Sequence, residues 1–144
     1  MNLREQFRQE LEKGRQFFDL EVGIISRICD EEYEVFTGLT QLPFFKEGDV
    51  FKLAETYCSE VARTRQTIYY NQVGLMGEMR FHPVYRSLQL ESYIGTPIMT
   101  GEKLWGTLNF SSIQAKEIRF AEQEIAYIEN AATQFASTIE NTPI

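Results

Sequence analysis

Apolar residues repeat at helical spacing near both ends of the chain. The first stripe predicts an amphipathic helix of about four turns, and its members are Leu3, Phe7, Leu11, Gly14 and Phe18. Asn2 precedes this stripe and Glu5 follows three residues later, a spacing typical of a helix N-cap. The last stripe, at alternating four- and three-residue steps, predicts a helix over residues 121–139. It comprises Ala121, Ile125, Ile128, Ala132, Phe135 and Ile139.

Between these helices, shorter runs rich in β-branched and aromatic residues predict strands. Residues 22–29 and 33–39 flank an acidic turn, and we expect them to form an antiparallel hairpin. Residues 67–70 predict a short strand. Residues 92–100 and 104–112 flank a tight turn, which predicts a second hairpin.

The strand expected at 104–112 carries different side chains on its two faces. Alternation places an apolar set on one face, namely Leu104, Gly106, Leu108 and Phe110. It places Trp105, Thr107, Asn109 and Ser111 on the other. Three small polar groups that face a covering layer need hydrogen-bond partners, and a cavity with water or ligand supplies them. Thr107, Asn109 and Ser111 are therefore candidate ligand contacts.

The middle of the chain predicts loops and one short helix before the second hairpin. Residues 41–48 include Pro43, Phe44 and Phe45, which predicts a loop with two aromatics tucked against the body. The short helix that follows has one face formed by Leu53, Tyr57, Cys58 and Val61. Residues 73–79 contain two glycines and two methionines, a composition that favours a mobile flap.

A last short helix is expected from His82-Pro83 through Leu88, because proline is well tolerated in a first helical turn. Arranged in layers, these elements predict an α/β fold of the α+β kind. One antiparallel sheet would carry the terminal helices on its apolar face and the mid-chain helices on its amphipathic face.

Length and charge narrow the class of protein. With 144 residues, 43% of them hydrophobic, we expect one domain with one continuous core. The net charge of −7 repels a phosphate backbone, so nucleic acid is not an expected partner. The apolar runs are far shorter than the ~20 residues of a membrane span. A charged N-terminus differs from a secretory signal, and we expect a cytoplasmic protein.

The sequence holds two cysteines without a CxxC pair and a single histidine, so neither a disulfide framework nor a metal site is expected. Cys58 lies on a helix, and a histidine nearby could activate it as a thiolate. The alternative is a small buried core residue, since free cysteine is among the most buried residue types. Cys29, at a strand end, is expected to be structural.

Several segments resemble a GAF domain over nearly the whole chain: FKLAETYC at 51–58, YIGTP at 93–97 and GTLNFSS at 106–112. With VGIISRI at 22–28, their spacing resembles in particular GAF domains attached to bacterial histidine kinases and diguanylate cyclases. The resemblance implies a five- or six-stranded antiparallel sheet and a ligand pocket opposite the terminal helices. It further implies that residues 1–144 form a single GAF domain of a larger signalling protein, which dimerises through those helices.

Two branches of this family imply alternative functions. Leu104-Trp105-Gly106 and the segment 82–85 are similar to the bilin-binding GAF domains of phytochromes. Those domains carry a His-Cys pair where this chain has His82-Pro83, and proline has no nucleophile, which excludes a covalent bilin at that position. Other GAF proteins reduce free methionine sulfoxide with clustered cysteines. Here only Cys58 is available, and the cycle stalls without a resolving thiol.

The remaining candidate ligand contacts are Tyr57, Cys58, Tyr85, Tyr93 and His82. The tyrosines could stack on a planar ligand or bond to it, and the alternative for each is a core position with a satisfied hydroxyl. His82 could lie at the pocket rim, where it would titrate near neutrality. Its alternative role is to cap the helix that begins at Pro83.

Together these patterns predict a non-catalytic sensory domain for a small molecule, or for a neighbouring domain alone. A ligand would order the 74–79 flap and bias the orientation of the terminal helices. The pocket-facing strand positions carry no Arg or Lys to hold the phosphate of a cyclic nucleotide. The ligand and any cofactor stay unidentified, and the expected partners are a second copy and an effector domain such as a kinase or cyclase.

Overall fold

The computed structural model describes residues 2–40, 42 and 45–142. The terminal helices are α1, Leu3–Phe18, and α4, Glu122–Glu140. The Asn2 side chain accepts a hydrogen bond from the Glu5 amide, which confirms the predicted N-cap. Because both apolar stripes keep helical spacing over their whole length, the two helices present one continuous apolar side each.

Six strands form one antiparallel sheet in the order β3-β2-β1-β6-β5-β4. Their bounds are β1 Val22–Cys29, β2 Glu32–Thr40, β3 Val50–Lys52, β4 Ile68–Tyr70, β5 Ser92–Thr100 and β6 Lys103–Ser112. Both predicted hairpins are present, as β1–β2 and β5–β6. Strand β1 of the first hairpin pairs with strand β6 of the second hairpin at the centre of the sheet.

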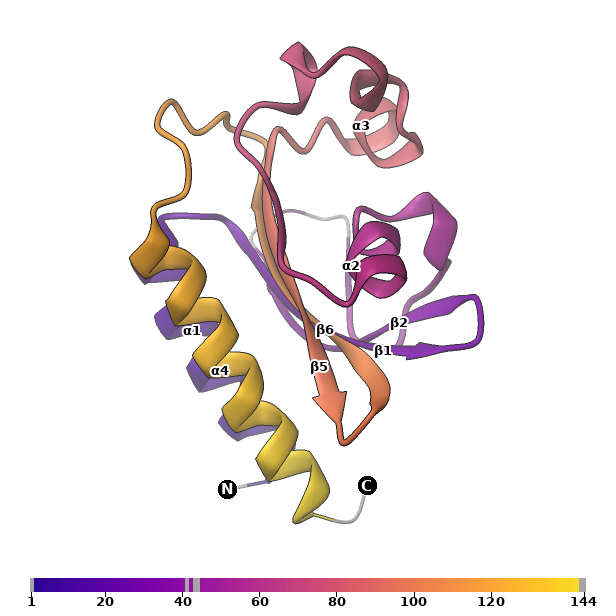
Figure 1. Ribbon diagram of the computed structural model, residues 1–144, viewed down its shortest axis with the longest axis vertical. Helices are drawn as coiled ribbons and strands as arrows, with labels where there is room; N and C mark the ends of the chain where they lie inside the picture. The colour runs from indigo at the N-terminus through magenta and orange to yellow at the C-terminus, as the bar shows by residue number, and fades with distance from the viewer. Residues whose placement is uncertain (1, 41, 43–44, 143–144) are drawn as a thin grey trace.

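Helices cover both faces of the sheet (Figure 1), as the layer prediction required. Helices α1 and α4 lie side by side on one face, and the shorter helices α2, Cys58–Thr64, and α3, Pro83–Leu88, lie on the other. Three 3₁₀ turns complete the second face: η1 Leu53–Glu55, η2 Val73–Leu75 and η3 Gly77–Phe81. The first turn of α1 and the last turn of α4 lie at the same end of the molecule.

The face under α1 and α4 holds an apolar core cluster that joins both helices to the sheet. Phe7 of α1 meets Phe135 of α4 edge to face, with ring centroids 4.7 Å apart. Gly14 lies so close to the Phe110 ring that a Cβ atom there would be 2.2 Å from Cζ. A residue larger than glycine would therefore push α1 off the sheet.

Two expectations about the middle of the chain are wrong. Residues 50–52 form the edge strand β3, which the sequence analysis did not separate from the loop, and Leu53 lies in η1. Helix α2 begins only at Cys58, so Leu53 does not share its face. Phe45 does pack against the pocket-side core, whereas Gln41, Pro43 and Phe44 of the predicted loop lie outside the described residues.

Alternation along β6 fails at the hairpin end. The β5–β6 register shifts by one residue, because Ile98 pairs with Gly106 and Met99 with Leu104, which leaves Trp105 without a partner. Beyond this bulge the parity reverses. Trp105 packs edge to face on Phe36 under the terminal helices, and Leu104 turns to the α2 side. Both side chains therefore lie on the face opposite to the one predicted.

Candidate ligand pocket

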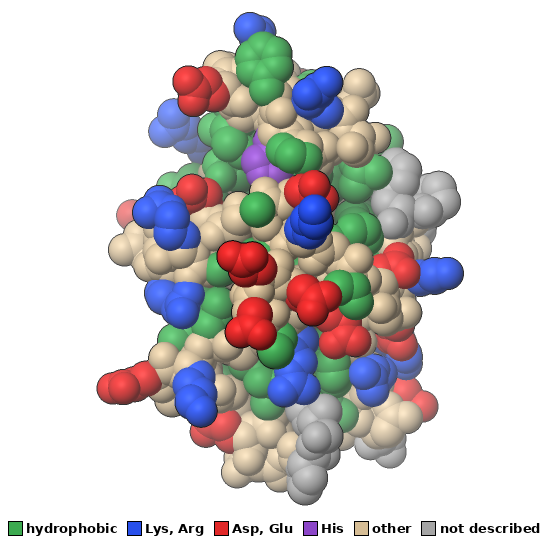
Figure 2. Space-filling view, turned by 90° about the vertical axis from the view of Figure 1, so that its right-hand side faces the viewer, with side chains coloured by type: hydrophobic (Ala, Val, Ile, Leu, Met, Phe, Trp, Pro, Cys, Tyr) green, Lys and Arg blue, Asp and Glu red, His purple; other side chains and the backbone are tan. Residues whose placement is uncertain are grey.

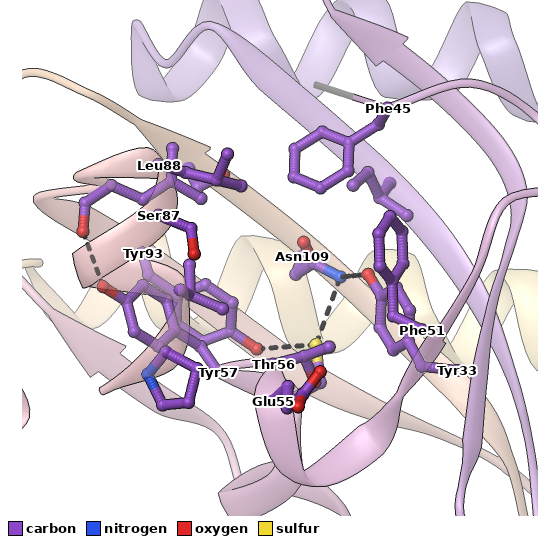
Figure 3. Close-up of a pocket in the computed structure, with 16 residues that line it drawn as sticks. Tyr33, Phe45, Phe51, Glu55, Thr56, Tyr57, Ser87, Leu88, Tyr93 and Asn109 are labelled. Atoms are coloured by element: carbon purple, nitrogen blue, oxygen red, sulfur yellow. Dashed lines mark hydrogen bonds between the residues drawn. The ribbon is translucent and has the colours of Figure 1, made fainter. Parts of the chain in front are cut away.

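A cavity of about 210 Å³ lies between the sheet and the elements α2, η1 and α3 (Figure 3). Its back wall is the face of β1, β2, β5 and β6 that is turned away from α1 and α4. Among its lining residues Glu55, Pro83 and Ser87 are exposed, so the cavity reaches the surface between η1 and α3. Helix α3 thus forms a lid over a pocket whose other walls are buried or half-buried.

The walls are mainly aromatic and aliphatic. Tyr57 and Tyr93 meet edge to face, with ring centroids 5.3 Å apart, and form one wall. Phe45 and Phe51 meet edge to face at 6.0 Å and form the opposite wall together with Tyr33. Figure 3 shows the two walls on either side of Asn109. Flat ring surfaces of this kind suit a planar ligand.

A buried hydrogen-bond network lies at the base of the pocket. The Cys58 thiol is 3.0 Å from Tyr93 Oη, and Thr107 Oγ1 donates to Cys58 Sγ over 3.2 Å. Behind them, Ser26 Oγ and Thr107 Oγ1 are 2.6 Å apart. Burial raises the pKa of the Cys58 thiol and raises that of the Tyr93 hydroxyl well above its ordinary value. At neutral pH these groups are therefore uncharged.

Asn109 connects this network to the cavity. Its Nδ2 donates to Tyr33 Oη over 3.2 Å, and it also lies 3.4 Å from Cys58 Sγ and from Thr107 Oγ1. These contacts orient the amide so that its nitrogen faces the protein, and Figure 3 shows its oxygen on the cavity side. The Asn109 side chain is held through its nitrogen before any ligand arrives.

The lid is attached through Glu91, the residue before β5. One carboxylate oxygen accepts from the Gly74 amide and the other from the Tyr85 hydroxyl, each over 2.8 Å. The hydrogen bond from the Tyr85 hydroxyl to the Glu91 carboxylate raises the pKa of Tyr85. Glu91 therefore ties α3 and η2 to the start of a central strand.

The structure brings together five of the eight predicted contacts and leaves three outside the lining. Around the cavity lie Tyr57, Cys58, Tyr93, Asn109 and Ser111. Thr107 lies one layer deeper, beneath Cys58, and does not line the cavity. Tyr85 also lies outside it, because its hydroxyl donates to Glu91.

His82 caps helix α3, which was the alternative role considered for it, and does not line the pocket. Its Nδ1 accepts a hydrogen bond from the Val84 amide and so caps α3, and its ring lies 5.0 Å from that of Tyr57, behind the wall. Burial lowers the pKa of the imidazole. Figure 2 shows this histidine between hydrophobic side chains on the face that carries α2 and α3, with acidic side chains gathered near the middle of the face.

The expected flap does not cover the pocket. None of the lining residues comes from 73–79, and Val73 is fully buried beside Glu91. The cover is α3, whose Pro83, Val84, Ser87 and Leu88 line the cavity. The Gly/Met composition of 73–79 instead builds the two turns η2 and η3.

Sequence reasoning missed Tyr33, Phe45, Phe51 and the α3 side chains as pocket residues. Tyr33 reaches Asn109 across the intervening strand, because β2 and β6 flank β1 in the sheet. Alternation within the first hairpin assigns Tyr33 a face but not this partner. Strand order is what brings them together, and no local pattern encodes it.

The two cysteines lie in different places, so the pocket holds a single thiol among the described residues. Cys58 lines the cavity, whereas Cys29 is exposed at the end of β1, which corrects its expected structural role. Within the described part of the chain, no three His, Cys, Asp or Glu side chains are grouped so as to hold a metal ion. Over the same residues, no helix is long and apolar enough to span a bilayer.

A six-stranded antiparallel sheet with two long helices on one face and a pocket beneath short helices on the other defines an α+β domain. Residues 2–139 match the GAF domain family, and the chain belongs to this family. No curated protein sequence matches the chain.

Solved structures, among them two GAF domains, share this fold at low sequence identity. The GAF domain from Acinetobacter phosphoenolpyruvate-protein phosphotransferase has a TM-score of 0.81 and 16% identity, covering 98% of this chain and 84% of that chain. The blue-light absorbing form of the Thermosynechococcus elongatus PixJ GAF domain has a TM-score of 0.75 and 16% identity, covering 96% and 84%. Type II free methionine-R-sulfoxide reductase from Thermoplasma acidophilum has a TM-score of 0.76 and 11% identity, covering 96% and 92%.

Proposed function

We propose that this chain is a non-catalytic sensory GAF domain that binds a small molecule in the pocket and passes the change to α1 and α4. The observation that carries this proposal is the cavity itself. It combines aromatic walls, a polar base that is already oriented, and a short helical lid that meets solvent. Such concave, mostly apolar sites with a few placed polar groups are typical of ligand pockets.

The route to the terminal helices is short. Strand β6 lines the pocket with Asn109 and Ser111, while its Leu108 and Phe110 pack under α1 and α4. A ligand that prefers one arrangement of β6 and α3 shifts the population of that arrangement, and the helices on the other face follow. In a longer signalling protein, α1 and α4 would carry this shift to an effector domain such as a kinase or cyclase.

Thiol chemistry has little support at this site. The raised pKa of Cys58 keeps it as the poorly nucleophilic thiol, and Cys29 does not line the pocket. A bilin is likewise disfavoured, because Pro83 lines the cavity without a nucleophile. The volume of about 210 Å³ also only modestly exceeds the ~150 Å³ of a cavity that binds benzene.

A metabolite library screened by thermal shift tests the proposal. A ligand present at about 100 times its Kd should stabilise the fold by about 2.7 kcal/mol. In Val84→Trp, which fills the cavity from the lid, the shift should be lost. In Val50→Trp, on the exposed edge strand β3, it should be retained. Hydrogen exchange with the bound ligand should slow in α3 and change in α4.

Three results would overturn the proposal: no compound raises the midpoint, the shift survives in Val84→Trp, or exchange in α4 is unaffected by the ligand. A colourless protein after expression with bilin synthesis would separately exclude the photoreceptor alternative.

We also propose a homodimer through α1 and α4. Most of their apolar stripes pack on the sheet, so the surface left for association is the flank where Phe17, 45% exposed, stacks on Tyr127 with centroids 4.1 Å apart. Sedimentation at tens of micromolar should give a dimer for wild type and Tyr127→Phe, and a monomer for Tyr127→Glu at an unchanged melting temperature. A monomeric wild type would contradict the proposal.

A further inference from the structure

We propose that the pocket selects a neutral, flat heterocycle of one or two rings that donates an N–H or O–H hydrogen bond to Asn109 Oδ1. This inference rests on the proposed function, because it names the class of ligand for the same pocket. It depends on three features of the site: an unused acceptor, an unused hydroxyl beside it, and the absence of a positive charge.

The unused acceptor is Asn109 Oδ1. Asn109 is only 3% exposed, and all three hydrogen bonds of its side chain involve Nδ2. No donor among the described residues bonds to Oδ1, which faces the cavity in Figure 3. Because this oxygen borders the cavity, a ligand N–H or O–H placed there would give it a hydrogen-bond partner without disturbing the bonds of Nδ2.

A second unused group follows two residues along β6. Ser111 is 3% exposed and lines the cavity, and its hydroxyl has no hydrogen bond to any described residue. Because side chains at i and i+2 lie on one face about 7 Å apart, the two groups are separated by roughly the width of a ring. A ligand with polar atoms on two edges would meet Asn109 and Ser111 together.

The lining excludes a strongly anionic ligand. Of the described residues around the cavity, none is Lys, Arg or His, and Glu55 at the mouth is the one acidic residue. The base of the pocket is uncharged, because burial raises the pKa of Cys58 and of the tyrosines Tyr33 and Tyr93. A carboxylate or phosphate would lose its hydration here without gaining a cation.

The size and shape of the cavity limit how large the ligand can be. The cavity of about 210 Å³ is somewhat larger than the ~150 Å³ that holds benzene, which corresponds to a substituted ring or two fused rings. The Tyr57–Tyr93 and Phe45–Phe51 walls offer ring faces and edges on both sides. A flat ring between them keeps its edge free to bond with Asn109.

Two pairs of probes with matched shapes test the inference by calorimetry, the first by removing a hydrogen-bond donor and the second by replacing an N–H donor group with an anionic one. Indole and benzofuran differ in that indole donates an N–H bond, so wild type should bind indole roughly 3- to 10-fold more tightly, the range expected of one neutral hydrogen bond. Benzamide and benzoate differ in charge, and benzoate should bind at least about tenfold more weakly than benzamide.

Variants then locate the effect. In Asn109→Leu the indole preference should fall to about onefold, while Asn130→Leu, exposed on α4, should keep the wild-type ratio. Ser111→Ala, a small change that leaves Asn109 in place, should keep the indole preference but weaken benzamide. If Asn109→Leu does not fold, Asn109→Gln serves instead, because the longer side chain displaces Oδ1 and should reduce the preference.

Equal binding of indole and benzofuran to wild type, an indole preference that persists in Asn109→Leu, or benzoate binding as tightly as benzamide would each overturn the inference. So would the absence of binding by indole and benzamide. These results leave the proposed function standing if the metabolite screen finds another ligand that Val84→Trp excludes. If that screen also finds no ligand, the proposed function and the ligand class are both wrong.

Discussion

Phe110 and Ser111 are neighbours on β6 and face opposite sides of the same sheet. Phe110 is buried against Gly14 and Phe18 beneath the terminal helices, with no room for another atom. Ser111 borders a cavity and has a hydroxyl without a partner among the described residues. At this point of the sheet one face is closely packed, and the other borders open volume.

This difference indicates that the two faces of a single strand have different roles, one in stability and one in forming the pocket. Close packing under α1 and α4 supplies stability, and it allows the pocket face to keep polar groups and empty volume that cost free energy. The same strands couple the two faces, since backbone movement on one side must move the packed side chains on the other. The following changes test this division, beginning with the largest expected effect.

Phe110→Ala should lower the free energy of unfolding by about 3–5 kcal/mol, because it leaves a cavity in the filled face. Ser111→Ala, one residue along, should change it by less than about 1 kcal/mol. Urea denaturation of both variants gives the comparison. Similar losses for the two would show that the faces do not differ in their contribution to stability.

Cys58→Ser should fold and lose about 1–2 kcal/mol, as a polar exchange in a buried site. It should keep its ligand response, and loss of response at an unchanged melting temperature would instead give Cys58 a functional role. Because the folded pKa of Cys58 is raised, its contribution to stability is complete below the ordinary thiol pKa of about 8.5 and declines as pH rises beyond it. Wild type should therefore lose more stability between about pH 7.5 and 9.5 than Cys58→Ser.

Glu91→Gln should loosen the lid, because an amide offers one acceptor where the carboxylate serves both Gly74 and Tyr85. We expect a loss of about 1 kcal/mol and faster hydrogen exchange in η2 and α3. Glu78→Gln, exposed in η3, is the matched control. Unchanged exchange in α3 would mean that Glu91 does not hold the lid.

His82→Ala should cost about 0.5–1 kcal/mol through loss of the α3 cap, while His82→Asn, which can still cap, should cost less. The lowered pKa of His82 means that its contribution is present above the ordinary value of about 6.5 and is lost as pH falls through the folded value. Between about pH 7 and 5, wild type should thus lose more stability than His82→Asn. Parallel pH profiles would contradict this assignment.

The sequence was most informative where hydrophobic periodicity is long. The two terminal helices, both hairpins and the distribution of helices over the two faces follow from spacing alone. Residues 50–52 were not predicted as a strand, because a three-residue edge strand has too few alternations to show a period. Trp105 and Leu104 were placed on the wrong faces because one unpaired residue reverses parity, and a bulge of this kind has no local signature here.

Strand alternation placed Asn109 and Ser111 on the pocket side, where they line the cavity, and their role as ligand contacts stays a prediction. Prediction of the site failed where the decisive partner comes from another element. Tyr85 points to Glu91, a residue whose role depends on how η2 and α3 fold back on β5. Likewise, only the packing of α2 over the sheet shows that Cys58 covers Thr107 and keeps it from the cavity.

The bulge at Trp105 also separates two parts of β6 that can change independently. From Gly106 toward Ser111, pairing with β1 fixes which side chains face the pocket. On the hairpin side of the bulge, an inserted or deleted residue changes the facing of the tip alone, because the β1 ladder holds the rest in register. A change in the length of the tip should therefore leave the order of pocket and core residues along the rest of the strand unchanged.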